Sequence, residues 1–198
     1  MNSNVDEEWE AFLNPDVLRP RLAQAAIFIV AFEMLKATIV DRIRSFFSVG
    51  FDSERDRASP EYANILARNR SPVHASLDWL VEQGAINAGD RLKFDDIKAC
   101  RNRIAHELLE VMSKGLPPEF DAQFGELVAL LRKIEVWWIL DVDVATDPRF
   151  DGQTIDEGGI VPGPIWGLQL LYEIALGSPE RSRFYYEEFR KRTKPTDV

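Results

Sequence analysis

The side chains best suited to chemistry on a phosphate lie in one short segment, Arg101-Asn102-Arg103-Ile104-Ala105-His106. Arginine is a permanent cation whose planar donor fork matches phosphate oxygens. Histidine is the side chain that gives or takes a proton near neutral pH without special tuning. Together they supply the minimum set for cutting a phosphodiester beside a 2′-hydroxyl group.

These residues must be positioned by a helix, which the sequence predicts from about Phe94 or Asp95 to Ser113, after a turn at residues 87–90 and before Gly115 and two prolines. At about 100° per residue, one face of this helix is apolar and packs on the core. That face holds Ile97, Cys100, Ile104, Leu108 and Val111. Arg101 lies on its flank. Asn102 and His106 are four residues apart on the opposite surface, where we expect them to touch.

The segment resembles the R-x4-6-H signature of HEPN domains, including the polar residue that typically follows the arginine. The earlier segments 31–36 and 41–43 also resemble the first long helix of that superfamily. The resemblance covers about residues 19–141. It implies an antiparallel, all-α HEPN-like helical bundle that dimerises through the motif helices.

The resemblance also implies an activity. Many HEPN proteins are metal-independent endoribonucleases that act as toxins or in antiviral defence, with a composite site formed by Arg101 and His106 of two chains. The expected partners are an RNA substrate, a second copy and an antitoxin or defence protein, with no cofactor and no metal. Other members bind a nucleotide or a protein without catalysis, which is the alternative function. One departure is Leu108, where some HEPN toxins carry a tyrosine that receives AMP.

Four further residues are candidates for supporting roles. Glu33 interrupts an apolar stretch, and a buried carboxylate needs a partner, so it is predicted to pair with Arg101 or to polarise His106. Arg103 lies on neither face of its helix and is a candidate RNA contact. Arg68 and Arg70 form a modest basic patch and are candidates for the same role.

Net charge lowers the expectation of a nucleic-acid ligand without removing it. The chain of 198 residues carries a net charge of −9, and cations dominate binding to phosphate. The acids are concentrated in residues 1–18 and 141–157, so the rest of the chain is near neutral. A second basic patch interleaved with aromatic residues lies near the C-terminus, where a solvated helix face is the more ordinary interpretation.

Proline and glycine positions divide the chain into helices without strand signals, which predicts an all-α fold. The predicted parts are an acidic lead-in (1–18), the bundle (19–141), an acidic Gly/Pro loop (142–163) and a C-terminal helical hairpin with a tail, packed on the bundle (164–198). Within them, helices are expected over 19–47, 61–67, 72–83, 120–140, 164–176 and 179–192.

Cysteine content and hydropathy predict the compartment. Cys100 is the single cysteine, so no internal disulfide can form, and no Cys/His cluster exists for zinc. The most apolar run, residues 25–32, is shorter than the roughly 20 residues that span a bilayer. The N-terminus lacks a cationic region typical of a signal peptide. We therefore expect a cytoplasmic protein that does not enter a membrane.

Overall fold

The computed structural model describes residues 3–48 and 59–193, and these residues fold into helices without a β-strand. The all-α prediction is therefore confirmed. The helices are α1 (Ser3–Leu13), α2 (Pro15–Phe46), α3 (Pro60–Leu66), α4 (Pro72–Glu82), α5 (Ala88–His106), α6 (Leu108–Lys114), α7 (Phe120–Trp137), α8 (Gly163–Leu176) and α9 (Pro179–Thr193). The residues predicted to form the C-terminal tail, 194–198, lie outside the described part.

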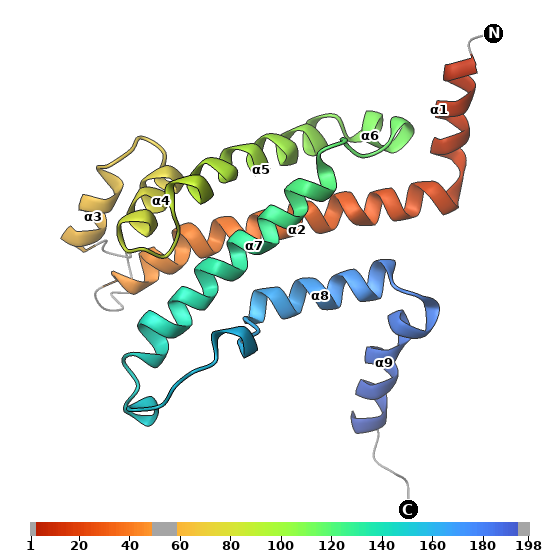
Figure 1. The fold of residues 1–198 in the computed structure, drawn as a ribbon. Coiled ribbons are helices and arrows are strands. Elements are labelled where there is room, and N and C mark those ends of the chain that lie inside the picture. The colour runs from red at the N-terminus through yellow and green to blue at the C-terminus, as the bar shows by residue number, and fades with distance from the viewer. Residues whose placement is uncertain (1–2, 49–58, 194–198) are drawn as a thin grey trace, which may run out of the picture.

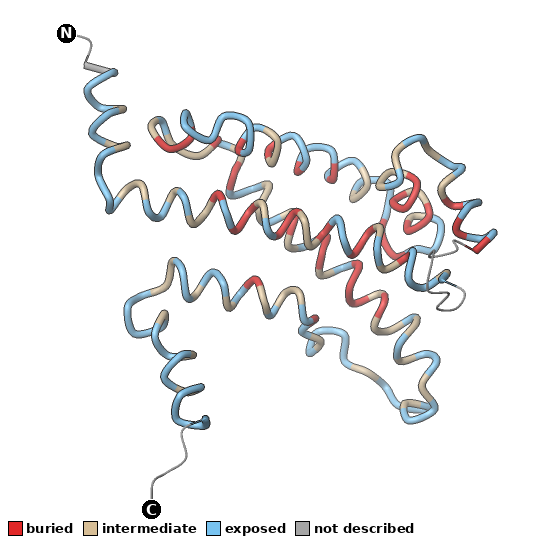
Figure 2. Tube along the Cα trace, turned by 180° about the vertical axis from the view of Figure 1, so that it is seen from behind, coloured by how far each residue is buried: buried red, intermediate tan, exposed pale blue. Residues whose placement is uncertain are grey.

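The long helix α2 forms the centre of the molecule. It packs against α4, α5, α7 and α8, and both α5 and α8 run in the opposite direction to it (Figure 1). Pro15 occupies its first turn after the N-cap Asn14, whose side chain accepts from the Asp16 amide at 3.0 Å. Its fully buried side chains, among them Phe28, Leu35 and Ile39, build the core (Figure 2).

Among the described residues, α2 is the one helix long and apolar enough, by length and composition, to cross a membrane. Of its most apolar stretch, 44% is buried inside the molecule. The helix also carries Glu33 and Arg42, which pair with Arg101 and Glu135 of other helices. A buried core helix can have the same length and composition as a membrane-spanning helix, and α2 packs against four other helices.

Helix α5 starts earlier than predicted. Asn87 and Asp90 form a capping box, in which the Asn87 side chain accepts from the Asp90 amide at 2.9 Å and the Asp90 side chain accepts from the Asn87 amide at 3.0 Å. This reciprocal pattern satisfies two free amides at a helix start. Residues 87–90, predicted to be a turn, therefore begin the helix.

Helix α5 also ends earlier than predicted. The chain leaves helical geometry at Glu107 (φ −111°, ψ 28°), and a separate helix, α6, starts at Leu108. The helical wheel therefore cannot be extended beyond His106. Leu108, predicted to lie on the core face, is exposed, whereas Val111 is buried. The prediction of one helix to Ser113 is thus wrong.

The segment after α7 is more ordered than a plain loop. The helix widens to a π-helix over Trp138–Val144, and two short 3₁₀ turns follow at Pro148–Phe150 and Glu157–Gly159. Arg132 of α7 donates to the backbone carbonyls of Glu157 at 3.1 Å and of Ile160 at 3.4 Å. These bonds hold the acidic segment on the bundle.

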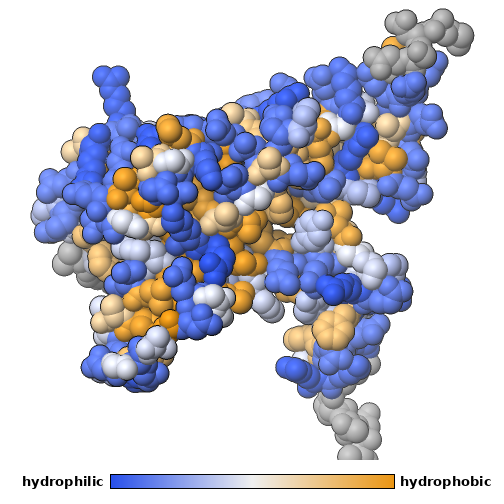
Figure 3. Space-filling model, viewed as in Figure 1, coloured by the Kyte–Doolittle hydropathy of each residue, from blue (hydrophilic) through white to orange (hydrophobic). Residues whose placement is uncertain are grey.

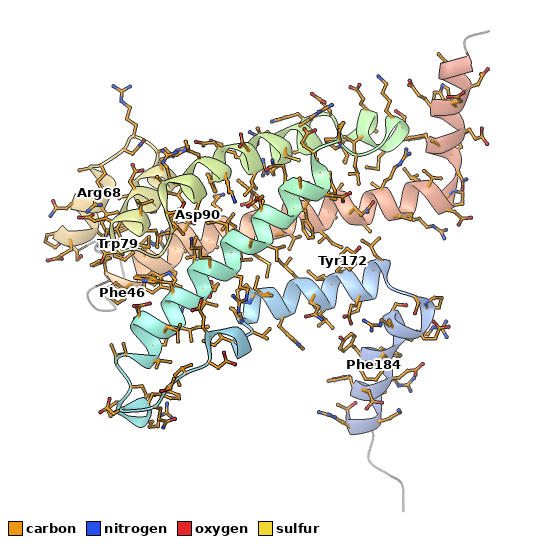
Figure 4. All side chains as sticks on the ribbon, in the orientation of Figure 1. Phe46, Arg68, Trp79, Asp90, Tyr172 and Phe184 are labelled. Carbon is orange, nitrogen blue, oxygen red and sulfur yellow. The ribbon has the colours of Figure 1, made fainter. Side chains whose placement is uncertain are left out.

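The two terminal helical segments lie at one end of the molecule. Helix α1 packs on α6 and on the start of α2, while α8 packs on α2 and α9 packs on α8 (Figure 1). The opposite end is closed by aromatic rings, with Phe46 and Trp79 near each other and Phe184 of α9 far away (Figure 4). At that closed end, Trp138 is 1% exposed and lies 5.4 Å from Phe46 and 6.1 Å from Trp79, between ring centroids.

Candidate functional site

Arg101 reaches from α5 across to α2. Its Nη2 donates to Glu33 Oε1 at 2.8 Å, and its Cζ lies 5.4 Å from the centroid of the Phe32 ring. Its Nη1 donates to Asn102 Oδ1 at 3.3 Å. The side chain is 28% exposed, so one carboxylate and one ring fix the guanidinium at the surface of the α2–α5 contact. Pairing with Arg101 is the first of the two roles predicted for Glu33.

Glu33 is held as an anion. Its Oε2 accepts from Lys36 Nζ at 2.9 Å, one helical turn further along α2. The hydrogen bond from Lys36 is the main cause that lowers the Glu33 pKa, and Arg101 adds to it against an opposing effect of burial. An ionised carboxylate with two cationic partners is a positioning group for Arg101 rather than a proton carrier.

Arg101 keeps one polar atom without a partner. Its Nε is buried and has no hydrogen-bond acceptor in the described structure. A buried donor left unpaired costs about 1–3 kcal/mol relative to a paired one. This N–H group therefore has an unfilled capacity to bind an acceptor oxygen, should one reach it.

His106 is the last residue of α5, and it is exposed. Within the described part of the chain, it forms no hydrogen bond with Asn102 or with Glu33, so the expected proximity of Asn102 and His106 is not secured by a hydrogen bond. The Asn102 side chain turns to Arg101 instead, because the guanidinium is a stronger donor than an imidazole four residues away. The imidazole is left free to meet a ligand.

The two motif residues diverge within one chain. Five residues of α-helix separate Arg101 from His106 by about 7.5 Å along the axis and about 140° around it. Arg101 is directed to α2, as the Glu33 and Phe32 contacts require. One chain therefore presents the guanidinium and the imidazole on different sides of α5.

The other predicted RNA contacts do not join this site. Arg103 is paired with Glu119 at 3.1 Å and with Glu107 at 3.4 Å. Arg68 is paired with Glu82, and Arg70 is exposed. Both precede α4, near the start of α5 rather than its end, and Figure 4 places Arg68 at the closed end of the molecule. Helix α5 is about 27 Å long, which separates these arginines from His106.

Sequence reasoning missed two residues that build the Arg101 environment. Lys36 has a recognisable signal, because a lysine three residues after a glutamate on a helix is a common ion pair. Phe32 has none, since its contact with Arg101 depends on how α2 and α5 pack. The second histidine, His74, lies 2.8 Å from Asp95 Oδ1 through its Nε2, and it links α4 to α5.

Among residues 3–48 and 59–193, no three His, Cys, Asp or Glu side chains gather as metal ligands would. Cys100 is buried, and burial raises the pKa of its thiol to about 11, so it is a thiol at neutral pH. Compared with known protein families, with curated proteins and with solved structures, the chain matches none of them.

Proposed function

We propose that this protein is a HEPN-type, metal-independent endoribonuclease of a prokaryotic toxin–antitoxin or antiviral defence system, acting in the cytoplasm as a homodimer. The observation that supports it most is the free imidazole of His106 at the end of α5, the helix whose Arg101 is held by Glu33 and Phe32 of α2. A proton carrier open to solvent and a fixed cation are the two groups that the reaction needs.

The proposed reaction uses two chains. A two-fold dimer contributes two His106 and two Arg101 side chains to one cleft. One imidazole removes the proton of the 2′-hydroxyl as its oxygen attacks phosphorus, and the other protonates the departing 5′-oxygen. The products are a 2′,3′-cyclic phosphate and a 5′-hydroxyl. The guanidinium groups stabilise the charge that develops on the phosphorane oxygens.

The divergence of Arg101 and His106 within one chain favours this composite arrangement. A single phosphate cannot meet both side chains of one protomer while Arg101 stays on Glu33, because they lie about 140° apart around α5. A second protomer relaxes this constraint, because its own His106 and Arg101 then add to the groups that can face one phosphate.

A non-catalytic HEPN-like module that binds a nucleotide or a partner protein is the alternative. The observation in its favour is that Glu33 and Asn102 already occupy both terminal nitrogens of Arg101. In that case an anion would bind next to Arg101 without undergoing a reaction. A purely structural protein is disfavoured, because His106 is exposed and forms no hydrogen bond or ion pair with residues 3–48 and 59–193.

The reaction is tested by incubating the purified protein with total RNA, with tRNA and with a DNA of matched sequence, all in EDTA. The proposal predicts RNA fragments that end in 2′,3′-cyclic phosphate and no cleavage of DNA, which lacks the attacking hydroxyl. Cleavage that requires a divalent ion, or fragments with 5′-phosphate ends, would overturn the mechanism. Tight nucleotide binding without cleavage would favour the alternative module.

A further inference from the structure

Helix α1 presents an uncovered apolar stripe. Val5, Trp9 and Leu13 are spaced by four residues, which places them on one face, and they are 48%, 58% and 70% exposed. Helix α1 packs on α6 through Phe12 at the edge of this stripe, where the Phe12 and Trp9 ring centroids are 5.9 Å apart. Beside the stripe lies a groove of about 280 Å³ that Trp9 and Leu109 line together. Side chains of this size are not usually left together in water.

The charge of α1 is of one sign. It carries Asp6, Glu7, Glu8 and Glu10 and no cation. None of these carboxylates forms an ion pair with the described part of the chain. Asp6 and Glu10 lie one turn apart along the solvent edge of the apolar stripe, by helical geometry. The surface therefore fits a partner that is apolar in the middle and basic along one edge.

Helix α9 has that complementary pattern. Arg183, Tyr186, Phe189 and Arg190 share one face, at spacings of three and four residues. Tyr186 and Phe189 are 62% and 64% exposed. Arg190 lies over the Tyr186 ring at 5.6 Å. Neither Arg183 nor Arg190 has a carboxylate within ion-pair distance in residues 3–48 and 59–193, whereas Arg181 of the same helix pairs with Glu173.

This face of α9 points away from the helix that supports it. Tyr185 and Arg181 on the other side of α9 bind Glu173 of α8, at 2.6 Å and 3.3 Å. Figure 3 shows α9 standing apart from the main body, at the end of the molecule where α1 also lies. Helix α9 is thus held in place by α8, while its aromatic and basic face remains uncovered.

We infer that the uncovered face of α9 binds the α1 stripe of a second copy of this chain. The two contacts are reciprocal: α9 of each protomer covers α1 of its partner, as a two-fold axis requires. Tyr186 and Phe189 meet Trp9 and its apolar neighbours, and Arg183 and Arg190 meet Asp6 and Glu10. Helix α1 packs on α6, which follows His106 after one residue, so the contact lies at the motif end of the bundle.

Charge reversal on each helix tests this contact in the full chain, with the molar mass in solution as the readout and RNA removed. The wild type is expected to have twice the chain mass of 22.6 kDa. Arg183→Glu with Arg190→Glu, and separately Asp6→Lys with Glu10→Lys, are each expected to weaken the dimer by about tenfold or more, because like charges then meet. The variant with all four substitutions restores the attraction and the dimer.

Two controls keep the result specific. Arg70→Glu with Arg149→Glu makes the same change in net charge on exposed residues outside α1, α5 and α9, and is expected to leave the dimer intact. His106→Ala is also expected to remain a dimer, so this inference does not rest on the proposed function. A monomeric wild type at tens of micromolar would overturn it, as would a four-fold variant that stays monomeric. If the protein were a monomer that binds single-stranded RNA through Arg183 and Arg190, this face of α9 would be an RNA-binding surface instead.

Discussion

Two arginine–carboxylate pairs connect α2 to its neighbours, and they differ in one respect. Arg42 pairs with Glu135 of α7, and Arg101 pairs with Glu33. The guanidiniums are similarly exposed, at 31% and 28%, and each lies over an aromatic ring, at 5.3 Å from Trp138 and 5.4 Å from Phe32. The carboxylates are not alike: Glu135 is 5% exposed, whereas Glu33 is 44% exposed.

The second hydrogen-bond partners of the two carboxylates differ in burial in the same way. Glu135 accepts a hydrogen bond from the buried Thr38 hydroxyl at 2.7 Å, inside the α2–α7 contact. Glu33 accepts from Lys36, an exposed ammonium. A buried carboxylate whose two hydrogen bonds both come from α2 fixes the position of two helices. An exposed carboxylate orients its arginine while leaving it within reach of solvent and ligands, which is the property that a site needs.

The largest expected effect separates the two pairs by stability. Glu135→Ala leaves the buried Thr38 hydroxyl without its acceptor and Arg42 with Asp143 as its remaining carboxylate, and is expected to lower the free energy of unfolding by about 2 kcal/mol. Glu33→Ala removes a solvent-screened partner and is expected to cost about 1 kcal/mol or less. Urea unfolding of both variants measures the difference. Equal losses would show that the two pairs do not differ in kind.

The next effect concerns activity. Arg101→Lys keeps the charge but loses the planar fork and the stacking on Phe32. We expect the rate of RNA cleavage to fall about a hundredfold, in the range found when one transition-state donor is removed, with little change in stability. Arg19→Lys, an exposed arginine of α2, is the matched control. A cleavage rate unchanged by Arg101→Lys would remove Arg101 from the site.

The smallest effect is a pH dependence. The Glu33 pKa is lowered in the folded protein, chiefly by Lys36, so the contribution of Glu33 to stability is present above its ordinary pKa of 4.5. It is lost as the pH falls through the lower folded value. Glu33→Gln removes this contribution, so its unfolding free energy should differ from that of the wild type by at most about 1 kcal/mol at pH 7, and less at pH 3. A difference that grows on acidification would contradict this assignment.

Local signals located most helices well. Proline and glycine punctuation predicted 61–67, 72–83, 164–176 and 179–192, close to the observed Pro60–Leu66, Pro72–Glu82, Gly163–Leu176 and Pro179–Thr193. The helix that carries the motif was predicted least accurately. Its capping box was interpreted as a turn, and no glycine or proline marks the break at Glu107.

Contacts between helices depend on packing that one sequence does not reveal. The Arg101–Glu33 pair was one of two predicted alternatives, because only these two motif groups suit a carboxylate in the first long helix. The Arg42–Glu135 pair was not predicted, since nothing in the local sequence fixes the register of α2 against α7. The exposure of His106 agrees with its place opposite the core face of α5, which helical geometry alone predicts.

The central claim is that His106 acts in chemistry and not in folding. Cleavage of one labelled RNA in EDTA, measured beside thermal unfolding, tests this claim with His106→Ala and with His74→Gln as the control for the other histidine. We predict that His106→Ala abolishes cleavage and unfolds at the wild-type temperature, while His74→Gln still cleaves. Cleavage by His106→Ala at the wild-type rate would contradict the claim.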